Sequence, residues 1–192
     1  DTNYKGGTHG IAVSPDGKVF AASHYGASWV SPDNDTLAAI CPIYVFASDG
    51  TPLDTIGTIT TGEGFLTETD TLTGNCRGLG VDQDGNILAA YSGGTRMFKI
   101  DYMTLEGIAK NEPTETGSSP TAPSVDAAGN IFVGPVVGGG TNEISIYDTD
   151  LNYLGSAVVG PPNIARTLEV SADGNTIFWM PFTSNPIQMF IY

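Results

Sequence analysis

One phrase recurs four times along the chain and constrains its fold more than any other feature. It reads HGIAVSPDGKVFAAS from His9, RGLGVDQDGNILAAY from Arg77, APSVDAAGNIFVGP from Ala122 and RTLEVSADGNTIFWM from Arg166. Each copy joins two apolar runs through a short turn that contains glycine, the residue that adopts the positive φ of a tight hairpin without steric strain. Each copy therefore predicts a β-hairpin.

The hairpins belong to larger repeating units. The turn glycines Gly17, Gly85, Gly129 and Gly174 lie 68, 44 and 45 residues apart, and a period of about 40–50 residues with several strands per unit is typical of a β-propeller. Further apolar runs follow the hairpins, at 42–47, 97–101, 143–148 and 186–192, and again at 52–56 and 153–159. We therefore expect one all-β domain of about four blades, each a four-stranded antiparallel meander, at about 8–75, 76–119, 120–162 and 163–192, with the last incomplete. Two insertions, His24–Cys41 and Gly57–Asn75, lengthen the first unit.

The repeat unit resembles the NHL and related YVTN-type propeller repeats. The resemblance rests on the strand GIAV or GLGV, the DGN or DGK turn after it, and an aromatic third strand that ends near Asp. The resemblance covers nearly the whole chain. It implies that the chain is an arc of a six- or seven-bladed ring, whereas a closed four-bladed ring completed by residues 1–5 is the alternative. These families include enzymes, binding modules and scaffolds, so the resemblance predicts a fold and leaves the activity open.

Composition excludes some classes of partner. The chain has 21 acidic and 7 basic residues and a net charge of −14, so it lacks the clustered cations that bind nucleic acid or anionic lipid. No apolar run approaches the ~18 residues of a membrane span. The sequence starts at Asp1 without a signal-like segment. We expect a secreted, extracellular or periplasmic protein whose targeting peptide has been removed.

Long connections join the second strand of each unit to the third, and one unit to the next, whereas the other turns are tight. Loops on a rigid scaffold carry binding sites more often than the scaffold does, so we expect the long-loop face to be the functional one. The innermost strands begin there with His9, Arg77 and Arg166. They predict an anion site at the channel mouth, because Arg binds carboxylate and phosphate through a planar fork. Pairing of each Arg with a buried acid is the alternative.

A second candidate lies in the first insertion. His24, Tyr25 and Trp29 form the densest aromatic cluster of the chain, and with Tyr91 they would make the wall of a ligand site. The alternative is that they only pack this loop against its blade.

Acidic residues in the two insertions suggest calcium, because hard oxygen ligands on a loop suit this ion. The candidate ligands are Asp33, Asn34 and Asp35 in the first insertion and Glu63, Glu68 and Asp70 in the second. Neither stretch fits an EF-hand, and solvated acidic loops are the alternative. Calcium is the only cofactor that we expect.

The two cysteines are expected near each other. Cys41 is expected to open the third strand of blade 1 and Cys76 the first strand of blade 2, and both of these strands start from the same face of adjacent blades. We predict a Cys41–Cys76 disulfide if the protein is exported, stabilising it by ~3 kcal/mol in the chain-entropy model. Two separately buried thiols are the alternative.

The residues thus favour a secreted binding or scaffold protein over an enzyme, because the chain lacks CxxC, HExxH and GxSxG motifs. Its partner would be a protein, a glycan or another copy of itself, held by the long-loop face or by open blade edges. The alternative is a metal-dependent hydrolase of the gluconolactonase/regucalcin kind. Resemblance to that family would require carboxylates at the channel-lining positions, where this chain has His9, Arg77 and Arg166.

Overall fold

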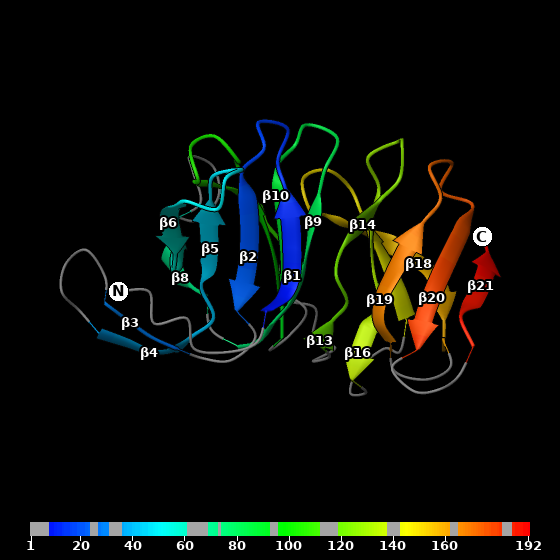
Figure 1. Cartoon of the computed structure of the whole chain (residues 1–192). Helices are drawn as coiled ribbons and strands as arrows, with labels where there is room; N and C mark the ends of the chain where they lie inside the picture. The colour runs from blue at the N-terminus through cyan, green and yellow to red at the C-terminus, as the bar shows by residue number, and fades with distance from the viewer. Residues whose placement is uncertain are drawn as a thin grey trace.

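The structure, a computed structural model, consists of antiparallel β-sheets arranged as an arc (Figure 1). It describes residues 8–23, 27–30, 36–60, 69–72, 74–92, 96–111, 119–137, 143–161, 165–181 and 186–192, with the backbone alone at 27–30, 36–39, 60, 69–71, 119, 136–137 and 166. Every regular element in these ranges is a strand, and they contain no helix that could span a membrane.

Four of the sheets are the blades. Blade 1 consists of β1 (Thr8–Val13), β2 (Val19–Ser23), β5 (Ile43–Phe46) and β6 (Pro52–Ile56), and blade 2 of β9 (Cys76–Val81), β10 (Ile87–Tyr91), β11 (Arg96–Ile100) and β12 (Gly107–Lys110). Blade 3 consists of β14 (Ser124–Val125), β15 (Ile131–Val133), β17 (Glu143–Tyr147) and β18 (Tyr153–Val159), and blade 4, as far as it is described, of β19 (Ala165–Val170), β20 (Thr176–Pro181) and β21 (Gln188–Ile191). The predicted all-β propeller of four-stranded antiparallel blades is confirmed.

Three small two-stranded sheets lie outside the blades. They pair β3 (Ala27–Val30) with β4 (Thr36–Ile40), β7 (Thr58–Thr60) with β8 (Thr69–Thr71), and β13 (Ser119–Pro120) with β16 (Pro135–Val137). The first two belong to the insertions of the first unit, which the sequence had indicated only as long loops.

An Asp–Asn pair closes the hairpin turn of blade 2. The Asp82 carboxylate accepts hydrogen bonds from the backbone amides of Asp84 (3.0 Å) and Asn86 (2.8 Å), and its second oxygen accepts one from the Asn86 side chain (3.0 Å). Gly85 supplies the turn residue with positive φ, at 88°. Asp126 with Asn130 and Asp148 with Asn152 repeat the pattern.

The blades stack in sequence order. The innermost strand β1 contacts β9, β9 contacts β14, and β14 contacts β19. We call the side of a blade that is turned toward the preceding blade its near face, and the side turned toward the following blade its far face. Close approach needs small residues: a Cβ placed on Gly10 would lie 2.6 Å from the amide nitrogen of Leu79. Blade stacking therefore explains the glycines of these strands.

Each pair of neighbouring blades encloses an apolar cluster. Phe20 and Val45 of blade 1 pack with Leu79 and Phe98 of blade 2. Corresponding clusters join blade 2 to blade 3 around Leu88, Met97, Ile131 and Tyr147, and blade 3 to blade 4 around Phe132, Ile144, Leu168 and Trp179. The core is thus a series of inter-blade layers, and this is why the strands read as near-continuous apolar runs.

Candidate functional site

The cationic residues predicted at the channel mouth lie on innermost strands. His9 in β1 and Arg77 in β9 are both half-buried. Each precedes a glycine, and these two glycines lie close together across the blades: a Cβ on Gly10 would stand 2.9 Å from Gly78. Arg166 is in β19, where only the backbone is described. The structure therefore brings His9 and Arg77 to adjacent strands, and the anion site stays a prediction.

Tyr91 does not line a ligand site. Its side chain is 0% exposed, its hydroxyl donates a 2.7 Å hydrogen bond to the Cys41 carbonyl, and its ring makes an edge contact with Phe98 at 5.9 Å. Burial raises the pKa of this phenol well above its ordinary value. The prediction for Tyr91 was wrong, because the residue ends a strand that neighbouring blades cover on both sides. Of its expected partners, His24 and Tyr25 lie outside the described residues, and only the backbone of Trp29 is described.

The predicted disulfide is not formed in the structure. Cys41 and Cys76 are buried thiols of the cluster between blades 1 and 2. Burial raises the pKa of the Cys76 thiol to about 12 and also raises that of Cys41. Apolar surroundings thus favour the protonated thiol, which is the unreactive form.

The calcium prediction falls mostly outside the described residues. Asp33, Asn34, Asp35, Glu63 and Glu68 lie beyond them, and Asp70 is described by its backbone alone. Among the side chains that the structure does describe, no group of three or more His, Cys, Asp or Glu residues is placed to hold a metal ion. Most of the long loops that carry the predicted functional face also lie outside the described ranges.

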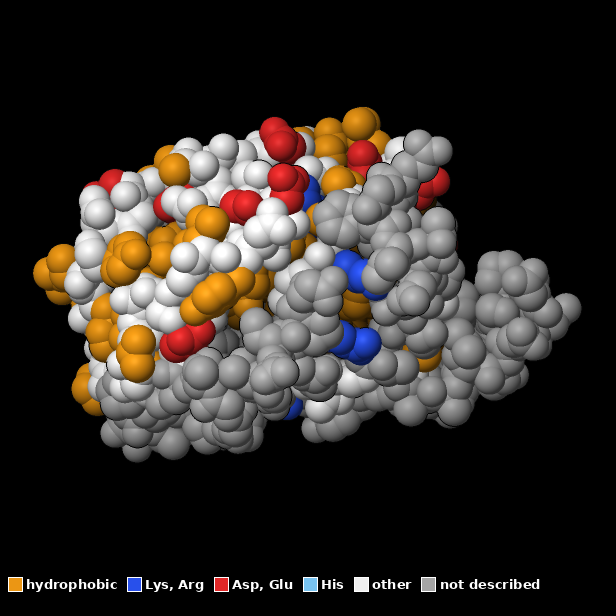
Figure 2. Space-filling view, turned by 180° about the vertical axis from the view of Figure 1, so that it is seen from behind, with side chains coloured by type: hydrophobic (Ala, Val, Ile, Leu, Met, Phe, Trp, Pro, Cys, Tyr) orange, Lys and Arg blue, Asp and Glu red, His pale blue; other side chains and the backbone are white. Residues whose placement is uncertain are grey.

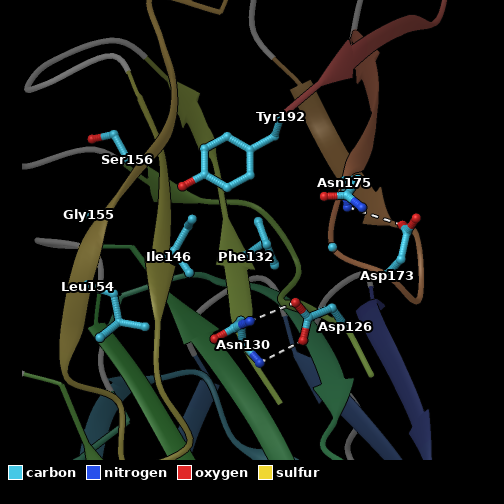
Figure 3. A pocket seen from close by; sticks show the side chains of 11 residues that line it. Asp126, Asn130, Phe132, Ile146, Leu154, Gly155, Ser156, Asp173, Asn175 and Tyr192 are labelled. Atoms are coloured by element: carbon cyan, nitrogen blue, oxygen red, sulfur yellow. Dashed lines mark hydrogen bonds between the residues drawn. The ribbon is translucent and has the colours of Figure 1, made fainter. Parts of the chain in front are cut away.

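A pocket of about 340 Å³ opens between blades 3 and 4 (Figure 3). It lies beside the tight hairpin turns of these blades, opposite to the long-loop face. Its polar lining comes from the turn residues Asp126, Asn130, Asp173 and Asn175, and its apolar lining includes Phe132, Ile146, Leu154 and Tyr192. The sequence did not indicate this pocket, because its polar residues are the ones that close the turns.

The turns already use most of the pocket's carboxylate oxygens. Asp126 accepts hydrogen bonds from the backbone amides of Ala128 and Asn130 and from the Asn130 side chain, and Asp173 accepts from Ser171 and Asn175. The Asn175 side chain also hydrogen-bonds the Asp173 carboxylate. Within the described part of the chain, the Tyr192 hydroxyl is left available, so the pocket can offer a phenol to a small polar ligand.

The near face of blade 1 is a second candidate: it is apolar, and none of the four described blades covers it. Ile11 is 64% exposed and Val13 is 55% exposed. Their pairing partners on β2, Ala21 and Val19, are half-buried. By strand register, Ile11 is the equivalent of Leu79 in blade 2, since Ile11 pairs with Ala21 and Leu79 pairs with Ala89. Leu79 is only 7% exposed, because blade 1 covers it.

The far face of blade 4 shows the same relationship at the other end of the arc. Phe178 pairs with Met189 across β20 and β21, as Phe132 pairs with Ile146 in blade 3. Phe178 is 42% and Met189 60% exposed, whereas Phe132 is 2% and Ile146 8% exposed beneath blade 4. Figure 2 shows apolar side chains gathered at the end of the molecule where blade 4 lies.

Solved structures share the fold of the chain at low sequence identity. It is similar over its full length to hydrazine synthase from Kuenenia stuttgartiensis, with 14% identity and a TM-score of 0.67, and spans 47% of that chain. It is similar over 99% of its length to virginiamycin B lyase from Staphylococcus aureus, with 17% identity, a TM-score of 0.54 and 71% of that chain covered.

A structure titled as a putative gluconolactonase matches 95% of the chain with 15% identity and a TM-score of 0.53, and 59% of it is covered. No family model matches the chain, and no curated protein does. The chain thus spans about half the length of the hydrazine synthase chain. These likenesses show a β-propeller fold.

Proposed function

We propose that the chain is a propeller binding or scaffold module that docks a protein partner on the near face of blade 1. The observation that carries this proposal is the equivalence of Ile11, which is 64% exposed, with Leu79, which is 7% exposed beneath a blade. The position that packs against a neighbouring blade in blade 2 is thus repeated in blade 1, where no described blade covers it. Apolar faces of this kind mark interaction sites in soluble proteins.

Physical chemistry favours a partner that covers this face. Burying an Ile or Val side chain fully is worth about 1.5–3 kcal/mol relative to leaving it exposed. Ile11 and Val13 lie on adjacent inner-strand positions of the same face, with Val19 and Ala21 beside them, so one flat apolar surface can cover all four. The repeats that build the face support, within this proposal, a relation to the NHL and YVTN-type propellers.

Affinity capture with face variants tests the proposal. The wild-type chain is immobilised and exposed to an extract of the source cells, beside the Ile11→Glu/Val13→Glu variant and a Met103→Glu control. Met103 is also 64% exposed but lies in a turn of blade 2. We expect proteins that the wild type and the control retain and the face variant loses. Retention of the same proteins by all three would contradict the proposal.

A small sugar or other polyol is a second candidate ligand, supported by the pocket between blades 3 and 4. The Tyr192 hydroxyl offers a hydrogen bond to a hydroxyl group, and the Tyr192 ring, 59% exposed, offers a stacking surface. Titration calorimetry with monosaccharides, using wild-type chain and Tyr192→Ala, tests this ligand class. Heat that is equal for both chains would contradict it.

The metal-dependent hydrolase of the gluconolactonase kind remains the alternative function. Elemental analysis and thermal melts with and without EDTA separate it from a binding module. A bound divalent metal whose removal lowers the melting temperature would favour the hydrolase. Unchanged melting with no bound metal would favour the binding module.

A further inference from the structure

We propose that the partner on the near face of blade 1 is the far face of blade 4 from a second copy of the chain. The two copies would stack head to tail at two equivalent junctions and close a ring of eight blades, four from each copy. This inference rests on the proposed docking function of blade 1 and names its partner.

The first support is continuity with the interfaces inside the arc. There, the far face of each blade packs on the near face of the next, as Phe132 of blade 3 packs in one cluster with Leu168 and Trp179 of blade 4. Phe178 on the far face of blade 4 is the register equivalent of Phe132. Since Ile11 is likewise the equivalent of Leu79, the two outer faces are the two halves of one further inter-blade interface.

The second support is the geometry of the arc. In Figure 1, blades 1 and 4 stand in front of blades 2 and 3, so both ends of the arc are turned toward the same side. A second arc facing the first would meet both ends at once.

Charge decides how this association responds to salt. Each copy carries a net charge of −14, so two copies repel each other at long range, and salt screens that repulsion. The contact positions Ile11, Val13, Phe178, Met189 and Ile191 are apolar. Glu169 pairs with Phe178 on the far face of blade 4 and is exposed, and its carboxylate accepts a 3.0 Å hydrogen bond from the Ser124 hydroxyl. We therefore expect the dimer to strengthen as salt is raised.

Light scattering coupled to size exclusion tests the proposal with two variants that each break one face. The blade 1 variant is Ile11→Glu/Val13→Glu, the blade 4 variant is Met189→Glu/Ile191→Glu, and Met103→Glu is the control. The monomer has a mass of 20.0 kDa. We expect wild type and control to reach twice this mass, each face variant alone to stay monomeric, and an equimolar mixture of the two variants to regain the dimer through its one intact junction.

Two outcomes would overturn the inference in different ways. A dimer formed by the blade 4 variant alone would show that blade 1 faces pair with each other. A wild-type chain that stays monomeric at all concentrations and salt levels would exclude a second copy as the partner. If the wild type stays monomeric, the affinity capture decides whether blade 1 docks another protein. A captured protein that only the blade 1 variant loses would support that docking function. A captured protein that the blade 1 variant retains would contradict both the docking function and the second copy. Circular dichroism of each variant verifies that it is folded.

Discussion

Gly78 in β9 lies so close to Ala122 that a Cβ on Gly78 would stand 2.3 Å from the Ala122 Cβ. This contact joins the innermost strand of blade 2 to the residues that lead into β14 of blade 3. We expect Gly78→Ala to lower the free energy of unfolding by about 3 kcal/mol, since overpacking displaces backbone or side chains. Urea denaturation measures the loss, and the double variant Gly78→Ala/Ala122→Gly should recover only part of it, because the new Cβ would still stand 2.6 Å from the Cα of residue 122. A Gly78→Ala variant as stable as the wild type would contradict this close approach.

A buried ion pair of blade 2 lies at the same junction and contacts blade 3. Lys99 Nζ lies 2.8 Å from Asp82 Oδ2 and donates a 3.1 Å hydrogen bond to the Thr149 carbonyl of blade 3. Burial alone would raise the pKa of Asp82, but hydrogen bonds from Lys99 and Asn86 outweigh it and hold that pKa below its ordinary value. Lys99→Met leaves the carboxylate buried without its cation, so we expect a loss of about 3–5 kcal/mol in unfolding free energy at neutral pH. A loss below about 1 kcal/mol would contradict the burial of the pair.

Stability should fall as the turn carboxylates are protonated. The hydrogen bond from Lys18 lowers the pKa of Asp16 to about 2, the Thr51 backbone amide lowers the pKa of Asp49, and the Ser171 hydroxyl lowers the pKa of Asp173. A depressed folded-state pKa stabilises the fold above the unfolded value of about 4, and this contribution is lost as the pH falls toward 2. Thermal melts from pH 6 to pH 2 should show a melting temperature that decreases below pH 4. In the Asp16→Asn variant this decrease should be smaller than in the wild type. A melting temperature that stays constant or rises over that range would contradict the linkage.

The two cysteines should be unreactive in the native protein. Cys41 is 1% and Cys76 0% exposed, and burial raises the pKa of both thiols. We expect Ellman's reagent to label neither thiol in the folded chain, and both of them after denaturation without a reductant. Absence of labelling in the denatured chain would reveal a disulfide, and rapid labelling of the folded chain would contradict the buried cluster.

The sequence predicted the blades better than it predicted the site. Gly17 and Gly85 marked hairpins that the structure forms, because a turn with positive φ is a local property of the chain. Tyr91 was misplaced, although the four apolar residues before it in β10 gave the signal of a strand covered on both faces. Ile11 and Leu79 occupy the same position of the same phrase, and only the stacking of blades distinguishes the exposed one from the covered one.

Leu79→Glu and Ile11→Glu together test whether the near face of blade 1 is an uncovered inter-blade face, since the two positions are equivalent and differ only in blade cover. We predict that Leu79→Glu lowers the unfolding free energy by more than about 3 kcal/mol, because it buries an unpaired charge. Ile11→Glu should change the unfolding free energy by less than about 0.5 kcal/mol, as is usual for exposed positions. Measured by urea denaturation of the monomer, equal losses for the two variants would contradict the claim that the near face of blade 1 is an uncovered inter-blade face.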